Sequence, residues 1–205
     1  LQENNVRDAK NYLTGGRTEE VGSQIAGGGD VVLAAAGNIQ ARAAHVQAAE
    51  ALVARAGGDI TIEAGEATSN YGMGYDRKGG GMLSKRTTTV RESAESTSAV
   101  GSSFNGGTLD IQAGQDIAVR GSDLNAQQQA YVAAGRDLTI ESTEQSESGS
   151  SFAQTKKSGF SASSKGIGYG KSNQSTDSRY HSVTQAGSSV TGADVVLQAG
   201  QEGQG

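Results

Sequence analysis

The sequence predicts an all-β fold, namely a right-handed parallel β-helix (β-solenoid) with rungs of about 21 residues, interrupted by two long Ser/Thr/Gly-rich β-hairpin excursions. Short apolar clusters recur at regular spacing along the chain, and Gly, Asn or Asp separates them. The 205 residues include 31 Gly, no Pro and no Cys, and 34% are hydrophobic. Such an apolar supply is too thin for a broad globular core but suits a narrow core shared along a stack. Disorder is the alternative, but a disordered chain would show no register.

A long repeat organises the chain. The motif Val21–Ile25 recurs as Val100–Phe104 and again as Ala186–Val190, at a spacing of about 79 to 86 residues. Each copy reads apolar, Gly, Ser, polar, apolar, and each leads into a short apolar cluster. The three copies therefore mark equivalent points in successive structural units.

A shorter period of about 21 residues lies inside the long repeat and defines one turn of the solenoid. Residues 37–39 (Gly-Asn-Ile) are matched by residues 58–60 (Gly-Asp-Ile), and residues 116–119 by residues 137–140. Strands of about three residues, such as Val31 to Leu33, alternate inward and outward side chains. Gly, Asn and Asp between the strands form the corners, because they tolerate positive φ best.

The elements follow in order along a single β-solenoid fragment over residues 1–205. Residues 1–24 end a preceding excursion, 25–63 form rungs, 64–103 form a hairpin excursion, 104–141 form rungs, 142–189 form a second hairpin excursion, and 190–205 start the next rung. An amphipathic helix is the alternative for residues 41–55, which are rich in Ala. The matching segment of the next repeat, residues 123–126, favours a polar rung instead.

Both excursions are dominated by Ser, Thr and Gly, with polar and apolar residues alternating along Thr87–Val90 and again from Phe152 to Ala162. Alternation predicts strands, and the glycines near residues 78–81 and 165–166 supply turns, which gives one long antiparallel hairpin in each excursion. A flexible linker is the alternative. It is weakened because the two excursions align with each other.

No residue pattern predicts catalysis, and we expect a protein that is not an enzyme, with no catalytic, cofactor-binding or metal-binding residues and no cofactor. The two histidines, His45 and His181, stand in no motif with a nucleophile or a metal ligand. Gly27–Asp30 is similar to part of a calcium-binding nonapeptide, but the required series is not repeated. The formal charge of −5 is spread out, with adjacent basic pairs at residues 85–86 and 156–157, so nucleic acid is not an expected partner.

The excursions hold the candidate contact residues, because large amphipathic rings contribute strongly at interfaces and membrane boundaries. These are Tyr71, Tyr75, Phe152, Phe160, Tyr169 and Tyr180. The hairpins could pack on the solenoid, present an apolar face to lipid, or associate edge to edge with another copy. Absence of Cys suits an exported chain, and Leu1 opens no signal peptide, so we expect an internal segment with any export signal upstream.

The rungs at Gly58–Gly65 and Gly135–Ser142 resemble filamentous haemagglutinin repeats, as do the Ser-rich excursions ending in Gly-Ser-Ser. The resemblance covers residues 21–200 and is closest to the later haemagglutinin-repeat region of contact-dependent growth inhibition (CdiA-type) toxin effectors. It implies export through an outer-membrane two-partner-secretion transporter and a location on the bacterial cell surface, outside the outer membrane.

The same resemblance implies a structural and interaction segment that helps deliver a C-terminal toxin into neighbouring bacteria. Its partner would be the outer membrane of the target cell or a surface receptor there. A filamentous adhesin that binds host cells or glycans is one alternative, and an inert stalk is the other.

Overall fold

The computed structural model describes residues 2–7, 10–164 and 166–200, and every regular element in these ranges is a β-strand. The all-β prediction is confirmed. Within the same ranges no helix is long and apolar enough to cross a membrane. The sequence predicts one fragment, whereas the residues of the structure group into two compact units. Of the described residues, 19–67, 98–145 and 184–200 form a rung unit, and 2–7, 10–18, 68–97, 146–164 and 166–183 form a hairpin unit.

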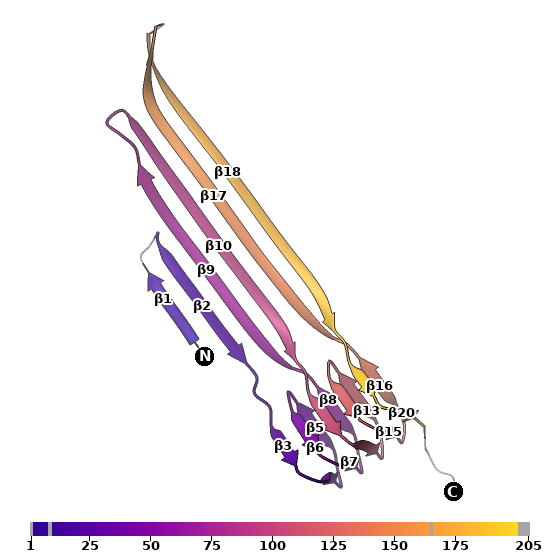
Figure 1. The fold of residues 1–205 in the computed structure, drawn as a ribbon. Coiled ribbons are helices and arrows are strands. Elements are labelled where there is room, and N and C mark those ends of the chain that lie inside the picture. The colour runs from indigo at the N-terminus through magenta and orange to yellow at the C-terminus, as the bar shows by residue number, and fades with distance from the viewer. Residues whose placement is uncertain (1, 8–9, 165, 201–205) are drawn as a thin grey trace. The chain divides into compact units, whose positions relative to one another are not determined.

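Three parallel sheets make up the rung unit, and the chain visits them in turn (Figure 1). The first sheet contains β3 (Gln24–Gly27), β6 (His45–Ala48), β11 (Ser103–Gly106), β14 (Asp123–Ala126) and β19 (Ser189–Thr191). The second contains β4 (Val31–Ala35), β7 (Ala51–Ala56), β12 (Thr108–Ala113), β15 (Gln129–Ala134) and β20 (Asp194–Gln198). The third contains β5 (Ile39–Arg42), β8 (Ile60–Glu63), β13 (Ile117–Arg120) and β16 (Leu138–Glu141). This arrangement is consistent with a β-helix.

Apolar residues stack in columns from rung to rung and form the core. In the third sheet Ile39 pairs with Ile60, Ile60 with Ile117, and Ile117 with Leu138. Ile60 and Ile117 are at most 1% exposed, because rungs lie on both sides of them. Full burial of one such side chain contributes about 1.5–3 kcal/mol. Strand β8 pairs with β13 across the first excursion, so the insertion leaves the column unbroken.

Residues 41–55, for which a helix was the alternative, lie in β5, β6 and β7 and in the two corners between them. Along β7, Leu52, Ala54 and Ala56 are buried, whereas Val53 and Arg55 between them are not. This period of two is that of a strand with one face on the core. The small side chains of Ala54 and Ala56 therefore lie in the core.

The corners before the third sheet are held by a ladder of side-chain to backbone hydrogen bonds. The Asp59 amide donates to Asn38 Oδ1 (2.9 Å), the Asp116 amide to Asp59 Oδ1 (3.1 Å), and the Asp137 amide to Asp116 Oδ1 (3.2 Å). Each Asn or Asp therefore satisfies a backbone N–H of the next rung that the sheet leaves unpaired. This explains why Asn or Asp recurs at this corner from rung to rung, as at residues 38 and 59, which are 21 residues apart.

Both long insertions occur at the corner between the third sheet and the first. The Ser102 hydroxyl donates to the Glu63 carbonyl oxygen at 2.7 Å, across 39 residues. The Ser188 hydroxyl donates to the Glu141 carbonyl oxygen at 2.6 Å, across 47 residues. The serine of the long repeat thus returns the chain to its rung after each hairpin.

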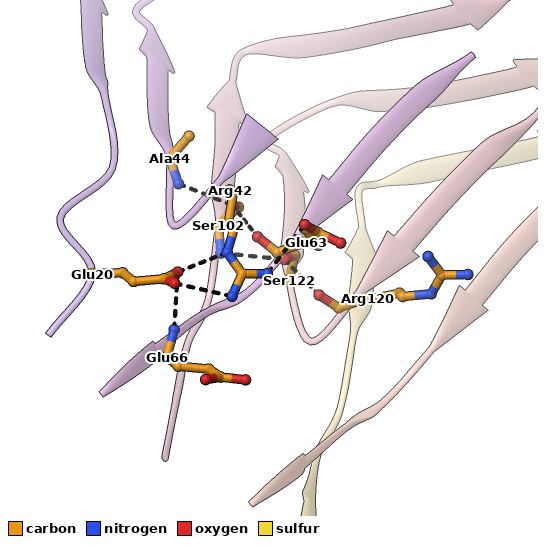
Figure 2. A network of polar contacts seen from close by, with 8 residues as sticks. All are labelled: Glu20, Arg42, Ala44, Glu63, Glu66, Ser102, Arg120 and Ser122. Carbon is orange, nitrogen blue, oxygen red and sulfur yellow. Dashed lines mark hydrogen bonds and ion pairs between the residues drawn. The ribbon is translucent and has the colours of Figure 1, made fainter. Parts of the chain in front are cut away.

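Two other corners of this kind carry no insertion. At one of them the Ser122 hydroxyl donates to the Arg120 carbonyl oxygen at 2.9 Å across Gly121, whose φ is 54° (Figure 2). At the other, Ala43 takes the same position with a φ of 50°. A single residue in the left-handed region is therefore enough to close the corner.

Ion pairs surround the first insertion corner, where Arg42 lies between two carboxylates (Figure 2). Its Nε donates to Glu20 Oε2 at 2.7 Å, and its Nη1 donates to Glu63 Oε1 at 3.2 Å. The hydrogen bond from Arg42 is the main reason why the pKa of Glu20 lies below its usual value. The amide of Glu66 also donates to Glu20, so this carboxylate joins three segments of the rung unit.

The hairpin unit is one six-stranded sheet (Figure 1). From one edge to the other its strands are β1 (Gln2–Arg7), β2 (Tyr12–Glu19), β9 (Gly65–Gly79), β10 (Ser84–Val100), β17 (Thr143–Ser163) and β18 (Gly166–Ala186). β1 pairs with β2, and β10 with β17, in antiparallel register. The excursions are therefore strands rather than linkers. Of the predicted turns, residues 80–83 connect β9 to β10, and Lys165 lies outside the described residues.

Candidate interaction site on the hairpin unit

The six aromatic residues singled out from the sequence all lie on strands of the hairpin sheet. Tyr71 and Tyr75 are on β9, Phe152 and Phe160 on β17, and Tyr169 and Tyr180 on β18. Five of them are exposed, from 39% for Tyr75 to 56% for Phe160, and Phe152 is half-buried.

Only one pair of these rings is in contact. The ring centroids of Phe160 and Tyr169 are 4.9 Å apart, at an interplanar angle of 49°. The Lys171 ammonium lies 5.6 Å from the centroid of Tyr169, within the range of a cation–π interaction. This end of β17 and β18 thus combines apolar surface with positive charge.

Tyr180 has a different role. Its hydroxyl donates to Glu147 Oε1 at 3.0 Å, and this hydrogen bond is the main reason why the pKa of Tyr180 is above its usual value. A Cβ on Gly149 would lie 2.5 Å from the Tyr180 ring, so the glycine makes room for it. Tyr180 therefore packs within the sheet.

A groove of about 1210 Å³ opens on the sheet near the ends of the hairpins. Five cationic side chains line it, and none of its lining residues is Asp or Glu. The five are Arg77, Lys85, Arg86, Lys157 and Lys171. Tyr75 and Phe160 line the same groove, so it brings together two of the predicted contact residues.

The groove depends on the register of β10 with β17, which brings together two of the three adjacent basic pairs of the sequence, at residues 85–86 and 156–157. Arg86 lies directly opposite Lys157, while Lys85 lies opposite Ser158 and Thr87 opposite Lys156. The positive charges look dispersed along the sequence, but the pairing of the strands brings five of them together at the groove. Like charges directly opposite each other are destabilising, by a few tenths of a kcal/mol up to about 1 kcal/mol. In the part of the chain that the structure describes, none of the groove cations is in an ion pair.

Nearby Arg91 behaves differently because its charge is compensated. Its Nη2 donates to Asp76 Oδ1 at 2.9 Å, and its Nη1 donates to the Tyr75 carbonyl oxygen at 3.0 Å. Burial raises the pKa of Asp76, but the hydrogen bonds from Arg91 and Thr89 outweigh it, so the pKa lies below its usual value. Arg91 is therefore part of the sheet's framework and not of the groove.

Large apolar side chains are exposed at the turns beside the groove. Met82 is 101% exposed and Leu83 65%, in the turn between β9 and β10, and Ile167 at the start of β18 is 81% exposed. The Phe160 amide donates to the Leu83 carbonyl oxygen at 2.9 Å, which ties the first turn to β17. Exposed aliphatic groups beside a cluster of cations are typical of a surface that contacts another protein or a membrane.

Comparison with known proteins identifies the family to which these features belong. The sequence model of the hemagglutinin repeat family matches residues 8–81 and 80–203, which is nearly the whole chain. The chain belongs to the hemagglutinin repeat family. The resemblance drawn from the rung motifs is therefore confirmed.

Relatives of this hemagglutinin repeat chain are CdiA proteins. It is 31% identical over 187 residues to the 16S rRNA endonuclease CdiA of Enterobacter cloacae, covering 88% of this chain and 6% of that protein. It is 30% identical over 153 residues to the tRNA nuclease CdiA of Escherichia coli STEC_O31, covering 72% of this chain and 5% of that protein. The toxin CdiA of Yersinia pestis is 39% identical over 110 residues, or 52% of this chain and 3% of that protein. No solved structure gives a significant match.

The family match and these relatives indicate that the chain is a hemagglutinin repeat segment of a CdiA-type exoprotein. The chain spans about a twentieth of the length of the first two relatives. Among the described residues of this segment, no group of three or more His, Cys, Asp or Glu side chains is placed to hold a metal ion. His45 accepts or donates a 2.8 Å hydrogen bond at Ser103 Oγ on an exposed rung face, and His181 is exposed on β18.

Sequence reasoning missed the basic groove, although a signal for it exists. Residues 77–91 and 148–176 contain nine of the chain's 17 Lys and Arg residues and no Asp or Glu. The two segments are far apart in the sequence, so the pattern looks dispersed until the hairpins are paired.

Proposed function

We propose that this hemagglutinin repeat chain is a non-catalytic structural and interaction segment of a secreted, cell-surface exoprotein, and that its hairpin unit contacts the target cell during delivery of a C-terminal toxin. The observation that carries the proposal is a separate unit of long, paired hairpins that ends in an exposed strand, β18. β18 is exposed along its whole length except at Ala186. The contact would be with the target outer membrane or with a receptor on it.

A segment that only supplied length would need the rungs alone. The corners at Ala43 and Gly121 each close with a single residue, whereas two equivalent corners carry insertions of dozens of residues. Ordering one residue costs about 1–2 kcal/mol of backbone conformational entropy. Ordering hairpins of this length therefore costs much conformational entropy that a stalk would not need to lose, and this favours a role in contact.

The nuclease activities named for the relatives belong to proteins of which this segment matches about a twentieth. The segment would then serve delivery rather than the reaction. Export through an outer-membrane two-partner-secretion transporter would place it on the bacterial cell surface, and the open edge of β18 would allow edge-to-edge association.

The solenoid itself is proposed to be right-handed, with rungs of about 21 residues. Residues paired between neighbouring rungs are 21 apart, as for Asn38 and Asp59. Crossover connections between parallel strands of one sheet are right-handed in about 98% of known cases. A crystal structure of the rung unit would decide the hand.

The experiment compares the intact chain with a variant that lacks both hairpins but keeps the corners. Residues 64–101 and 142–187 are each replaced by one Gly, which gives Glu63-Gly-Ser102 and Glu141-Gly-Ser188 in imitation of residues 120–122. Binding of both purified proteins to target bacteria is measured, and the same replacement in the full-length exoprotein is tested in a growth competition with target cells.

We expect the variant to retain a β-sheet circular dichroism spectrum, to bind target bacteria at least 10-fold more weakly, and to lose growth inhibition. Unchanged binding and inhibition would overturn the proposal in favour of an inert stalk. Hairpin-dependent binding to host cells or glycans, with none to bacteria, would overturn it in favour of an adhesin.

A further inference from the structure

We propose that the ends of the two long hairpins form a binding site for phosphorylated lipid headgroups at a membrane surface. In this site the groove cations bind phosphate, and the exposed turn residues enter the acyl region. The inference rests on the proposed function and deepens it by naming the chemistry of the surface that is contacted.

The charge distribution is the first support. With nine of its 17 basic residues and no acidic residue in segments 77–91 and 148–176, the chain has strong positive charge in one region of an acidic protein. All 22 Asp and Glu residues lie in the remainder. Each Lys or Arg near an anionic membrane surface strengthens binding, so a cluster of this size is enough for measurable affinity.

The geometry of the groove is the second support. Cations from β9, β10, β17 and β18 line it, while Gly79 and Gly170 leave open space beside them because they have no side chain. Its volume of about 1210 Å³ is above the usual range for small-molecule sites, about 300–1,000 Å³, and would admit a sugar-phosphate headgroup.

The pairing of Arg86 with Lys157 is the third support. Two cations directly opposite on one face of an antiparallel pair repel each other unless an anion lies between them. Phosphate would accept two parallel hydrogen bonds from the Arg86 guanidinium and one from the Lys157 ammonium. The destabilising pair would then become a favourable one in the bound state.

The exposed apolar side chains favour lipid over other polyanions. Met82, Leu83 and Ile167 are aliphatic and cannot stack on nucleic-acid bases, and an acidic polysaccharide offers no apolar phase for them. A bilayer offers both phosphate and an apolar layer. The ring pair of Phe160 and Tyr169, with Lys171 beside it, fits the boundary between the two layers.

The test is co-sedimentation of the intact 205-residue chain with phosphatidylcholine vesicles, with or without lipid A, which carries two phosphates on a sugar headgroup. The double variant Arg86→Gln/Lys157→Gln removes two groove cations. The double variant Arg55→Gln/Arg179→Gln is the control. It has the same net charge as the groove variant, and neither residue lines the groove. Met82→Ser/Ile167→Ser tests the apolar contribution.

We expect binding only to vesicles that contain lipid A. The groove variant should bind about 10- to 30-fold more weakly than the intact chain, the control within about 3-fold, and the apolar variant at least 5-fold more weakly. Equal binding to both kinds of vesicle, or equal loss in the control and groove variants, would overturn the proposal.

Two further arms separate other ligands. Abolition of binding by inorganic phosphate, with no effect of the apolar variant, would show a site for free phosphate and overturn the membrane assignment. Tighter binding to a single-stranded RNA oligonucleotide than to lipid A vesicles would overturn it in favour of nucleic acid. If the hairpins bind target bacteria but not vesicles, this inference fails while the proposed function stands. If they bind neither, both fail.

Discussion

The Ser102 hydroxyl donates a 2.7 Å hydrogen bond to the carbonyl oxygen of Glu63, although a complete hairpin separates the two residues. The same hydroxyl accepts a 2.9 Å bond from the amide of Ala44 in the neighbouring rung. Its amide in turn donates to Ser122 Oγ at 3.2 Å, and the amide of Ser122 donates to Ser188 Oγ at 3.2 Å. The serines of successive rungs are thus linked, and the link is independent of what is inserted between them.

Replacing Ser102 with Ala should lower the free energy of unfolding by about 1–3 kcal/mol. Ser102 is 1% exposed, so its loss leaves the Ala44 amide and the Glu63 carbonyl oxygen without this partner in a buried place. Urea unfolding followed by circular dichroism measures the change. Ser103→Ala is the control, because its hydroxyl bonds to exposed His45, and it should stay within about 0.5 kcal/mol of the intact chain. Equal loss in the two variants would contradict the role assigned to Ser102.

Replacing Gly121 with Ala should destabilise the rung unit by about 1–3 kcal/mol. The φ of 54° is unfavourable for Ala, and its Cβ would lie 2.4 Å from Thr143 Cγ2. Thermal unfolding by circular dichroism checks this. Gly28→Ala is the matched control, because no heavy atom lies within 4 Å of its new Cβ and its φ is not in the left-handed region. A Gly121→Ala protein as stable as the control would show that the corner relaxes without strain.

Stability should fall as the solution is acidified from about pH 6 to about pH 3. Hydrogen bonds from Arg42 and Arg136 are the main reasons why the pKa values of Glu20 and Asp116 lie below their usual values. A carboxyl group whose pKa is lower in the folded state adds stability above its unfolded pKa, and this stability disappears as pH falls through the folded pKa. The loss should therefore begin near about pH 5 and continue below about pH 4.

The pH effect is checked by urea unfolding at a series of pH values. Glu20→Gln and Asp116→Asn should each flatten the dependence, because the substituted group no longer titrates. Both groups are exposed, so the change in slope should be small and reduced by salt. A slope that stays the same in both variants would show that other carboxyl groups cause the acid sensitivity.

The short period and the corner residues could be predicted because each depends on local chemistry. Asn38 and Asp59 are one rung apart, and the side chain of each accepts a hydrogen bond from a backbone amide of the rung that follows. The spacing of these residues in the sequence therefore equals the length of a rung. The β-strand at residues 51–56 was harder, since its Ala content also suits a helix. There the alternating burial of Leu52 and Ala54 in the stack overrides intrinsic propensity.

The basic groove could not be predicted in the same way. Arg86 and Lys157 meet only because β10 pairs with β17 in one register, and no local motif at either residue sets that register. A shift by one residue would turn every side chain of the strand to the opposite face. The sequence also nominates the aromatic residues as candidate contacts, but it does not show how each ring is packed. Tyr75 and Phe160 line the groove, whereas Tyr180 packs over Gly149.

Replacing Glu147 with Gln should lower the pKa of Tyr180 toward the usual value of about 10 for a tyrosine. The Glu147 carboxylate accepts a 3.0 Å hydrogen bond from the Tyr180 hydroxyl and raises its pKa, because ionised Tyr180 would face a negative charge. A raised folded pKa means that this bond stabilises the fold below the unfolded pKa and is lost as pH rises through the folded one.

Absorbance at alkaline pH, read as the difference from Tyr180→Phe, isolates the titration of Tyr180. Tyr71→Phe is the matched subtraction, since Tyr71 is exposed on β9 and distant in sequence from Glu147. If Tyr180 titrates identically with Glu and with Gln at position 147, the hydrogen bond to Glu147 does not raise its pKa. Packing against Gly149 would then be the only contact that positions the ring, and the Tyr180 hydroxyl would be open for contact with a partner.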